Sequence, residues 1–263
     1  MAIVKTEMVS FPGADGQILA ARLDSPNDNT RAYALFAHCF TCGKDVFAAS
    51  RIAGRLCEHG VAVFRFDFTG LGASEGEFAN TNFSSNVADL IAAADYLRVT
   101  YRAPTLLVGH SLGGAAVLAA ADRVPESKAV VTLAAPSDPG HVAGLFRDHL
   151  AQIEHEGEAQ VVLAGRTFTI KRQLLRDIAE QNLAAKVSTL RRALLVMHSP
   201  TDTTVDVVNA TRIFTAAKHP KSFISLDGAD HLLTAHRDAR YVADLIAVWS
   251  ERYAFDDPPS GVA

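Results

Sequence analysis

Cysteine is scarce in this chain, and long apolar runs are missing. The 263 residues include 3 cysteines, an odd number that argues against a disulfide framework and suits a reducing compartment. The longest apolar stretches, such as 32–40, fall far short of the roughly 18 residues that cross a bilayer. Residues 1–12 lack the apolar centre of a secretory signal. We therefore expect a cytoplasmic protein that does not bind membranes.

Positive charge is not in excess either. Lys and Arg number 25 against 29 Asp and Glu, a net charge of -4. That balance provides no basic surface for nucleic acid. With 49 % hydrophobic and 21 % charged residues, the composition is that of a globular domain and excludes a disordered chain. We expect a small-molecule partner and no nucleic acid, and the sequence is compatible with a monomer or a homodimer.

Short apolar runs alternate with helical patterns along most of the chain. The apolar runs predict strands at 33–37, 61–66, 105–108, 129–134, 193–197 and 222–226. Helices are predicted at 47–59, 83–99, 111–122, 206–217 and 237–253. Uninterrupted apolar strands separated by helices are typical of a parallel sheet covered on both faces. The predicted fold class is therefore α/β, with a doubly wound, mostly parallel sheet.

Two segments depart from that alternation. Segments 4–11 and 18–23 flank a turn and predict an antiparallel N-terminal strand. Between 137 and 190 no buried strand is evident, and the pattern predicts a helix over 146–156, a hairpin over 160–170 and a helix over 172–183. We interpret residues 137–190 as a small cap inserted into a core of residues 1–136 and 191–255, followed by a disordered tail at 256–263.

The strongest signal for chemistry is Gly109-His110-Ser111-Leu112-Gly113, between a predicted strand and an Ala-rich predicted helix. A sharp strand-to-helix turn exposes a serine hydroxyl, and it needs small residues two positions before and after the serine. The helix that begins there directs backbone N–H groups toward developing negative charge. We predict that Ser111 is a nucleophile; the alternative is a glycine-rich turn that matches by chance.

An activated serine requires a base and an acid that orients it, in the chain order serine, acid, histidine. His231 follows the last predicted strand in a loop that leads back over the serine, whereas His236 begins the final helix. Asp202 follows strand 193–197, whereas Asp206 lies at a helix start, where aspartate usually caps. We predict His231 and Asp202; the alternatives are a surface histidine and a turn-stabilising aspartate.

Two backbone amides are needed to hold an oxyanion. We predict the amide of Leu112, directly after the nucleophile, and the amide of Phe40, in the loop after strand 33–37. In proteins with this fold, the corresponding loop often begins with His-Gly, but here Cys39 follows His38 in place of the glycine. We expect His38 to be a structural hydrogen-bonding residue. Candidate substrate contacts are Cys39, His110, Leu145, Phe146 and Phe168, although core packing explains the last three equally well.

Two further motifs carry weaker signals. Cys39 and Cys42 form a C-x-x-C sequence, which elsewhere indicates metal binding or thiol exchange. No second pair is available for zinc, so we favour neither a metal site nor a redox role, but inactivation by oxidation or alkylation there is a hypothesis. Cys57 is expected in the core. Segment 67–76 matches a nucleotide-binding loop poorly, and we interpret it as a structural loop.

Taken together, the sequence resembles the α/β-hydrolases over almost its full length. It is similar in particular to the hydrolase half that some bacterial proteins carry fused to an OsmC-like peroxide-handling domain. The resemblance rests on segments 38–42, 64–76, 109–114 and 229–231, and it implies a Ser111–Asp202–His231 triad and ester hydrolysis. Nothing after Tyr253 could form the OsmC-like domain. We therefore expect a stand-alone relative or a separated half, without peroxidase activity.

The predicted activity is hydrolysis of short- to medium-chain carboxylic esters through an acyl-enzyme, without metal or cofactor. One alternative is a small-molecule-binding module that has kept the fold and lost turnover. The complete set of serine, histidine and aspartate argues against it, because a receptor has no need for all three. Perhydrolysis or amide cleavage would use the same groups, and the sequence does not separate these reactions from ester hydrolysis.

Overall fold

The computed structural model describes residues 4–255; the predicted tail at 256–263 lies outside the described residues. The central strands are β1 (Val4–Pro12), β2 (Ile18–Pro26), β3 (Ala32–Ala37), β4 (Val61–Phe66), β5 (Leu106–His110), β6 (Ala129–Leu133), β9 (Ala193–His198) and β10 (Lys221–Ser225). The helices beside them are α1 (Phe47–Glu58), α2 (Phe83–Thr100), α3 (Leu112–Ala120), α7 (Val208–Ala216) and α8 (His236–Ala254). The predicted strands and helices of the core are present, with ends shifted by up to three residues.

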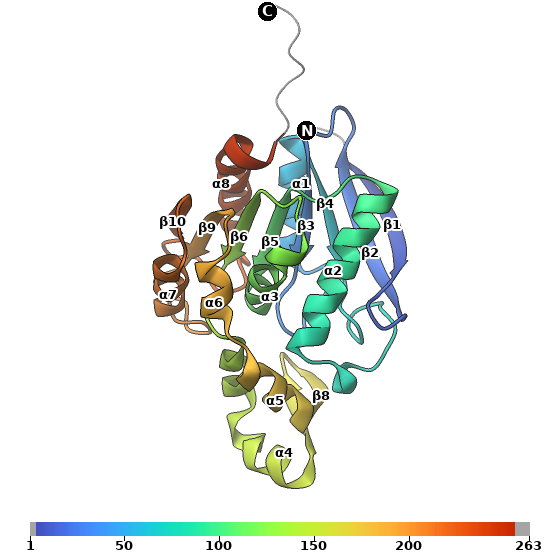
Figure 1. Cartoon of the computed structure of the whole chain (residues 1–263), viewed down its shortest axis with the longest axis vertical. Helices are drawn as coiled ribbons and strands as arrows, with labels where there is room; N and C mark the ends of the chain where they lie inside the picture. The colour runs from blue at the N-terminus through green and yellow to red at the C-terminus, as the bar shows by residue number, and fades with distance from the viewer. Residues whose placement is uncertain (1–3, 256–263) are drawn as a thin grey trace, which may run out of the picture.

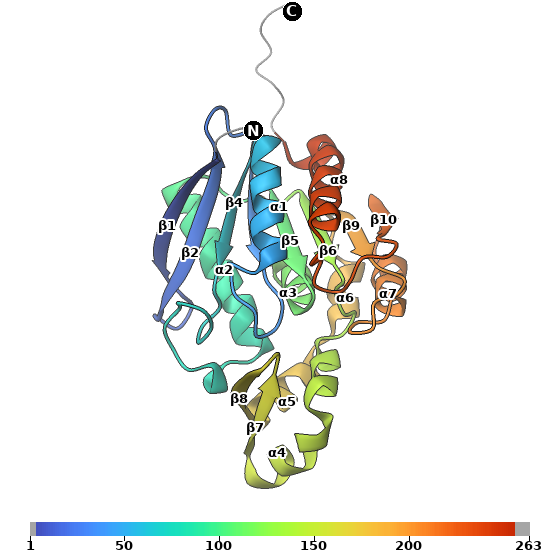
Figure 2. The same cartoon turned by 180° about the vertical axis from the view of Figure 1, so that it is seen from behind.

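These strands form one sheet of eight, within residues 4–255, in the order β1-β2-β4-β3-β5-β6-β9-β10. Every neighbouring pair from β4 to β10 is parallel. Only β2 runs against both of its neighbours, β1 and β4. Helices α2, α3 and α7 cover one face, and α1 and α8 cover the other (Figures 1 and 2). The predicted fold class is confirmed.

Successive residues of the buried strands pack into the apolar layers on opposite faces of the sheet. Leu35 and Phe64 belong to the apolar layer that includes α2 and α3, whereas their neighbours Phe36 and Val63 belong to the layer with α1 and α8. Because both faces are covered, these strands contain no polar alternation and read as continuous apolar runs. Within the part of the chain that the structure describes, no helix is both long and apolar enough to cross a membrane.

A smaller unit lies beyond the carboxyl ends of the strands (Figure 1). It consists of the 3₁₀ segment η3 (Pro139–His149), α4 (Leu150–Glu156), β7 (Glu158–Leu163), β8 (Arg166–Lys171), α5 (Arg172–Glu180) and α6 (Leu183–Ser188). β7 and β8 form their own antiparallel sheet, so the predicted hairpin is present. The predicted helix over 146–156 begins only at Leu150, because Phe146 has a non-helical φ of -133°.

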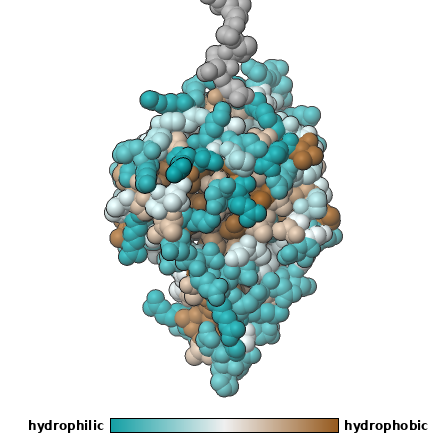
Figure 3. All heavy atoms as spheres, in the orientation of Figure 1, coloured by the Kyte–Doolittle hydropathy of each residue, from teal (hydrophilic) through white to brown (hydrophobic). Residues whose placement is uncertain are grey.

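The molecular surface on the face of Figure 3 is mostly hydrophilic. Apolar residues appear there in small groups and not as one broad patch. Two further 3₁₀ turns, η1 (Phe78–Asn80) and η2 (Ala121–Arg123), complete the described elements. Because most strands of the sheet are parallel, the loops that follow them meet at its carboxyl edge, next to the smaller unit.

Candidate active site

Ser111 lies between the last residue of β5 and the first residue of α3. Its backbone has φ 53° and ψ -124°, a conformation that residues other than glycine rarely adopt. Two main-chain hydrogen bonds hold it there: the Ser111 amide donates to the Leu133 carbonyl at 2.8 Å, and the Gly114 amide donates to the Ser111 carbonyl at 2.8 Å. The chain therefore reverses within one residue, as the glycine spacing predicts for an exposed serine.

The two glycines around the serine allow this turn to close. A Cβ at Gly109 would lie 2.3 Å from the carbonyl oxygen of Gly113. A Cβ at Gly113 would lie 2.3 Å from the carbonyl oxygen of Ala37 and 2.4 Å from that of His38. Both contacts involve main-chain atoms, which cannot rotate away as a side chain could. The first turn of α3 is thus packed directly against the loop that follows β3.

The structure brings the three predicted side chains together. His231 Nε2 lies 3.0 Å from Ser111 Oγ, and His231 Nδ1 lies 2.7 Å from Asp202 Oδ2. Asp202 Oδ1 accepts hydrogen bonds from the amides of Thr204 at 2.8 Å and Val205 at 2.9 Å. Because Nδ1 faces a carboxylate, it carries the proton, and Nε2 is left to accept from the serine hydroxyl.

The ionisation of Asp202 suits this arrangement. Burial by itself would raise the pKa of this carboxyl group, but the hydrogen bonds from His231 and from the amides of Val205 and Thr204 outweigh burial and hold the pKa below its ordinary value. Asp202 is therefore a carboxylate at neutral pH, able to orient the imidazole of His231 and to stabilise its protonated form.

Comparison with a solved structure decides the family. The esterase domain of a Rhodothermus marinus protein is 50% identical, and the alignment covers 95% of this chain and 99% of that chain with a TM-score of 0.78. Mouse alpha/beta hydrolase domain-containing protein 10 shares the fold, with a TM-score of 0.77 over 94% of this chain and 99% of that chain at 20% identity. This chain is an α/β-hydrolase.

Two sequence comparisons agree with that assignment. Residues 28–153 of the hydrolase match the model of the serine aminopeptidase, S33 family. Human monoglyceride lipase is 33% identical over 135 residues, which are 50% of this chain and 39% of the lipase. The hydrolase therefore matches about two fifths of the length of that relative.

The two residues weighed against His231 and Asp202 have other positions. Asp206 Oδ1 accepts a hydrogen bond from the amide of Val208 at 2.8 Å, at the start of α7. It therefore holds the first amide of α7 from the position before the N-cap residue, Val207, close to the capping role that the sequence indicated. His236 is the first residue of α8 and lines a different surface cavity with residues of α1, among them Arg51 and Arg55.

Two buried histidines support the site through main-chain atoms. His110 Nε2 donates to the carbonyl of His231 at 2.7 Å, and His198 Nε2 donates to the carbonyl of Val205 at 2.7 Å. Burial lowers the pKa of both residues, that of His110 to about 4, so both are neutral at physiological pH. His110 was a predicted substrate contact, and the structure places its Nε2 on the backbone of His231. His198 was not predicted, although its position at the end of the strand before Asp202 could have indicated it.

A small cavity lies beside the serine turn, and both predicted oxyanion residues line it. Its walls include Phe40, Leu112, Gly113 and Phe68. No acceptor among residues 4–255 takes a hydrogen bond from the amide of Phe40 or Leu112. These two amides therefore have no partner there, as the predicted oxyanion role requires, whereas the neighbouring amide of Gly114 donates to the carbonyl of Ser111.

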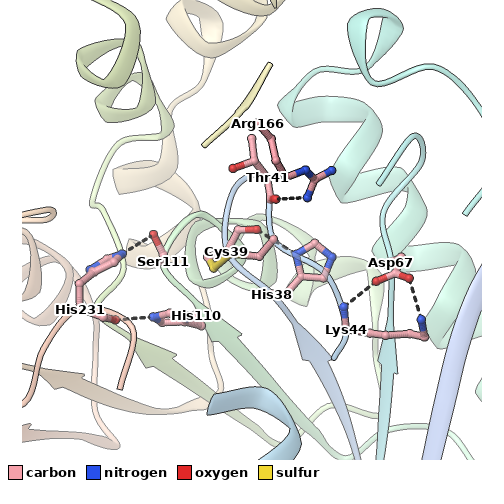
Figure 4. Close-up of a disulfide and its surroundings, with 10 residues drawn as sticks. His38, Cys39, Thr41, Lys44, Asp67, His110, Ser111, Arg166 and His231 are labelled. Atoms are coloured by element: carbon pink, nitrogen blue, oxygen red, sulfur yellow. Dashed lines mark hydrogen bonds and ion pairs between the residues drawn. A yellow bond between two sulfur atoms is a disulfide. The ribbon is translucent and has the colours of Figure 1, made fainter. Parts of the chain in front are cut away.

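The loop that contains Phe40 is anchored at both ends. His38 Nδ1 donates to the carbonyl of Cys39 at 2.8 Å, as a structural histidine should. Lys44 Nζ lies 2.8 Å from Asp67 Oδ2, and both side chains are buried (Figure 4). Burial would raise the pKa of Asp67, but the hydrogen bonds from the Ala73 amide and from Lys44 lower it below its ordinary value. These contacts agree with our interpretation of segment 67–76 as a structural loop.

The prediction about cysteine pairing was incomplete. Cys39 and Cys42 form a disulfide, with their Cα atoms 5.3 Å apart. An odd cysteine count argues against a framework of several bridges, but it does not exclude one bridge across a tight turn. Cys57 is the free, buried thiol that the sequence placed in the core. Among the described residues, no three His, Cys, Asp or Glu side chains could together hold a metal ion.

The remaining candidate contacts lie in the smaller unit. Leu145 and Phe146 line a separate cavity with residues of β7, and Phe146 is also part of the core. Phe168 packs edge-on against Phe78 with ring centres 4.8 Å apart, and Phe78 lies 5.7 Å from the ring of Phe40. The hairpin therefore reaches the loop of Phe40 through an aromatic row, whereas Leu145 and Phe146 do not line the cavity beside the serine.

Proposed function

We propose that this hydrolase cleaves short- to medium-chain carboxylic esters through an acyl-enzyme on Ser111. The observation that carries the proposal is the continuous hydrogen-bonded row Asp202–His231–Ser111 at the carboxyl edge of the sheet. The 50% identity with the Rhodothermus marinus esterase domain and the similarity to monoglyceride lipase support an ester as the substrate. Cys39 lines the same cavity as Phe40 and Leu112 and is our candidate contact for the substrate.

In the first half-reaction, Ser111 Oγ attacks the ester carbonyl while His231 Nε2 takes its proton. Asp202 stabilises the imidazolium without accepting the proton. The carbonyl oxygen becomes an oxyanion and accepts hydrogen bonds from the amides of Phe40 and Leu112. His231 then returns the proton to the leaving alcohol, and the acyl group remains on Ser111.

In the second half-reaction, His231 takes a proton from water, and the hydroxide attacks the acyl-enzyme carbonyl. The same two amides hold the second oxyanion. Collapse of this intermediate releases the carboxylic acid and returns the proton to Ser111 Oγ. His231 Nε2 accepts each proton and then returns it, so the cycle requires no metal or organic cofactor. Perhydrolysis or amide cleavage would use the same steps with another nucleophile or leaving group.

A panel of p-nitrophenyl esters from acetate to decanoate tests this proposal. We expect the wild-type protein to prefer the shorter members, and Ser111→Ala to lose at least about 10³-fold in kcat/KM on all of them. Ser10→Ala is the matched control, because Ser10 is exposed on β1, and it should retain the wild-type rates. Equal rates for Ser111→Ala and wild type would instead support a binding module whose slow turnover does not use this serine.

A further inference from the structure

The disulfide lies around the amide that we assign to the oxyanion. Phe40 and Thr41 are the two residues between Cys39 and Cys42. The amide of Cys42 donates to the carbonyl of Cys39 at 3.1 Å, and Thr41 has a φ of 59°, so the four residues form a tight turn. Figure 4 shows this turn between Ser111 and the buried pair of Lys44 and Asp67. The bridge therefore closes a ring that contains the Phe40 amide.

Such a bridge contributes little to the stability of the whole fold. A disulfide acts mainly by restricting the unfolded chain, and the effect grows with the length of the loop that it closes. The loop here has only two residues between the cysteines. The surrounding segments are already held by the hydrogen bond from His38 and by the buried pair of Lys44 and Asp67. The consequence of the bridge is therefore local and concerns the direction of the Phe40 amide.

The two sulfur atoms have different surroundings. Cys39 is 5% exposed and lines the cavity with Leu112 and Gly113, the first residues of α3. Cys42 is half-buried and thus more accessible. A helix N-terminus stabilises a thiolate, so Cys39 is the better leaving group and Cys42 is the sulfur open to attack.

We propose that the Cys39–Cys42 disulfide is a second reactive site of this protein, which exchanges with small dithiols and thereby controls the oxyanion amide of Phe40. A dithiol thiolate bonds to Cys42 Sγ, the Cys39–Cys42 bond breaks, and its electron pair leaves with Cys39 Sγ. The second thiol of the reagent then attacks the mixed disulfide and releases Cys42. The protein gains two electrons, Cys42 takes up the proton of the second reagent thiol, Cys39 remains a thiolate, and the dithiol becomes a cyclic disulfide.

The effect on catalysis follows from the position of Cys39 and rests on the proposed function. In the oxidised protein the bridge fixes the turn and the direction of the Phe40 amide. After reduction the turn is free to relax, and the Cys39 thiolate competes with the oxyanion for the amides at the start of α3. We expect kcat to fall about tenfold with KM nearly unchanged, less than the 10²–10³ that removal of an oxyanion donor costs.

Thiol counting on the folded protein tests the exchange itself. Protein purified without reductant is incubated with dithiothreitol, alkylated with iodoacetamide without denaturant, and weighed by mass spectrometry. Cys57→Ala is the control, because Cys57 is buried and burial raises its pKa to about 12. Cys42→Ser removes the bridge while leaving the residue that lines the cavity. Ester hydrolysis is measured on a portion of each sample taken before alkylation.

We expect two alkyl groups, on Cys39 and Cys42, only after reduction, in wild type and in Cys57→Ala alike. The kcat of both should fall and recover on reoxidation with oxidised glutathione, and Cys42→Ser should have the lower kcat with or without dithiothreitol. Three alkylated cysteines before reduction, a bridge that resists dithiothreitol unless the protein is denatured, or a kcat unaffected by reduction would each overturn the proposal. A protein that exchanges the bridge but hydrolyses no ester would contradict the proposed function alone.

Discussion

His110 donates a hydrogen bond from Nε2 to the carbonyl of His231, and this bond links the loop of His231 to the end of β5. The imidazole needs only one proton for it, and burial lowers the pKa of His110 from 6.5 to about 4. His198 acts in the same way on the loop of Asp202, through the carbonyl of Val205. Both strand-end histidines are therefore positioning residues, and each acts through a partner of Ser111.

The pKa of His110 predicts acid sensitivity of the fold. Between pH 6.5 and 4 the unfolded chain binds a proton at His110 that the folded protein does not, so its contribution is present above pH 6.5 and is lost as the pH falls. The difference between the two pKa values corresponds to roughly 3 kcal/mol. In His110→Gln, which keeps a donor, the free energy of unfolding should decrease less steeply over this range in urea titrations.

His155→Gln provides the matched comparison, because His155 is exposed on α4 and its replacement should leave the slope unchanged. If His110→Gln and wild type lose stability in parallel between pH 6.5 and 4, the neutral, buried state of His110 is not what holds the loop. The pKa values of His38 and His198 are lowered as well, so these residues also add to the pH dependence of stability. Their contribution is the same in wild type and in His110→Gln, and it cancels when the two slopes are compared.

At the scale of elements, the turn between β5 and α3 depends on contacts between main-chain atoms. In Gly113→Ala the new Cβ would meet the carbonyl oxygens of Ala37 and His38 at 2.3 and 2.4 Å. We expect this variant to lose at least about 2 kcal/mol of stability and most of its hydrolytic activity. Thermal unfolding and ester hydrolysis measure the two effects.

Gly54→Ala is the matched control for that substitution. Gly54 lies inside α1, and nothing lies within 4 Å of the position of its Cβ. Alanine favours a helix over glycine, so the control should be as stable as wild type or more stable by up to about 1 kcal/mol. Equal stability of Gly113→Ala and Gly54→Ala would contradict the close packing of α3 against the loop after β3.

The core elements were predictable because strands that are buried on both faces appear in the sequence as continuous apolar runs. β5 and β6 are buried along their whole length, so they appear as continuous apolar runs ended by a glycine-rich motif or a proline. The smaller unit gives a weaker trace. Its predicted helix over 172–183 is α5, which ends at Glu180, and the following helix α6 (Leu183–Ser188) was not predicted. Asn182 begins α6 by accepting a hydrogen bond from the Ala185 amide.

At the scale of the whole molecule, the positions of Ser111, Asp202 and His231 could be inferred because parallel strands bring their carboxyl ends to one edge. Chain order and strand ends then select the residues. The supporting contacts could not be inferred in this way. The pairing of Lys44 with Asp67 and the bridge between Cys39 and Cys42 depend on loop conformations, which leave no periodic pattern in the sequence.

The central claim is that Ser111 becomes covalently acylated with help from His231. The most direct test is mass spectrometry of the protein after reaction with a fluorophosphonate ester, followed by mapping of the modified peptide. The account predicts one adduct per chain, on Ser111, absent in Ser111→Ala and formed far more slowly in His231→Ala. An adduct on another residue, or equal labelling of Ser111→Ala, would contradict it.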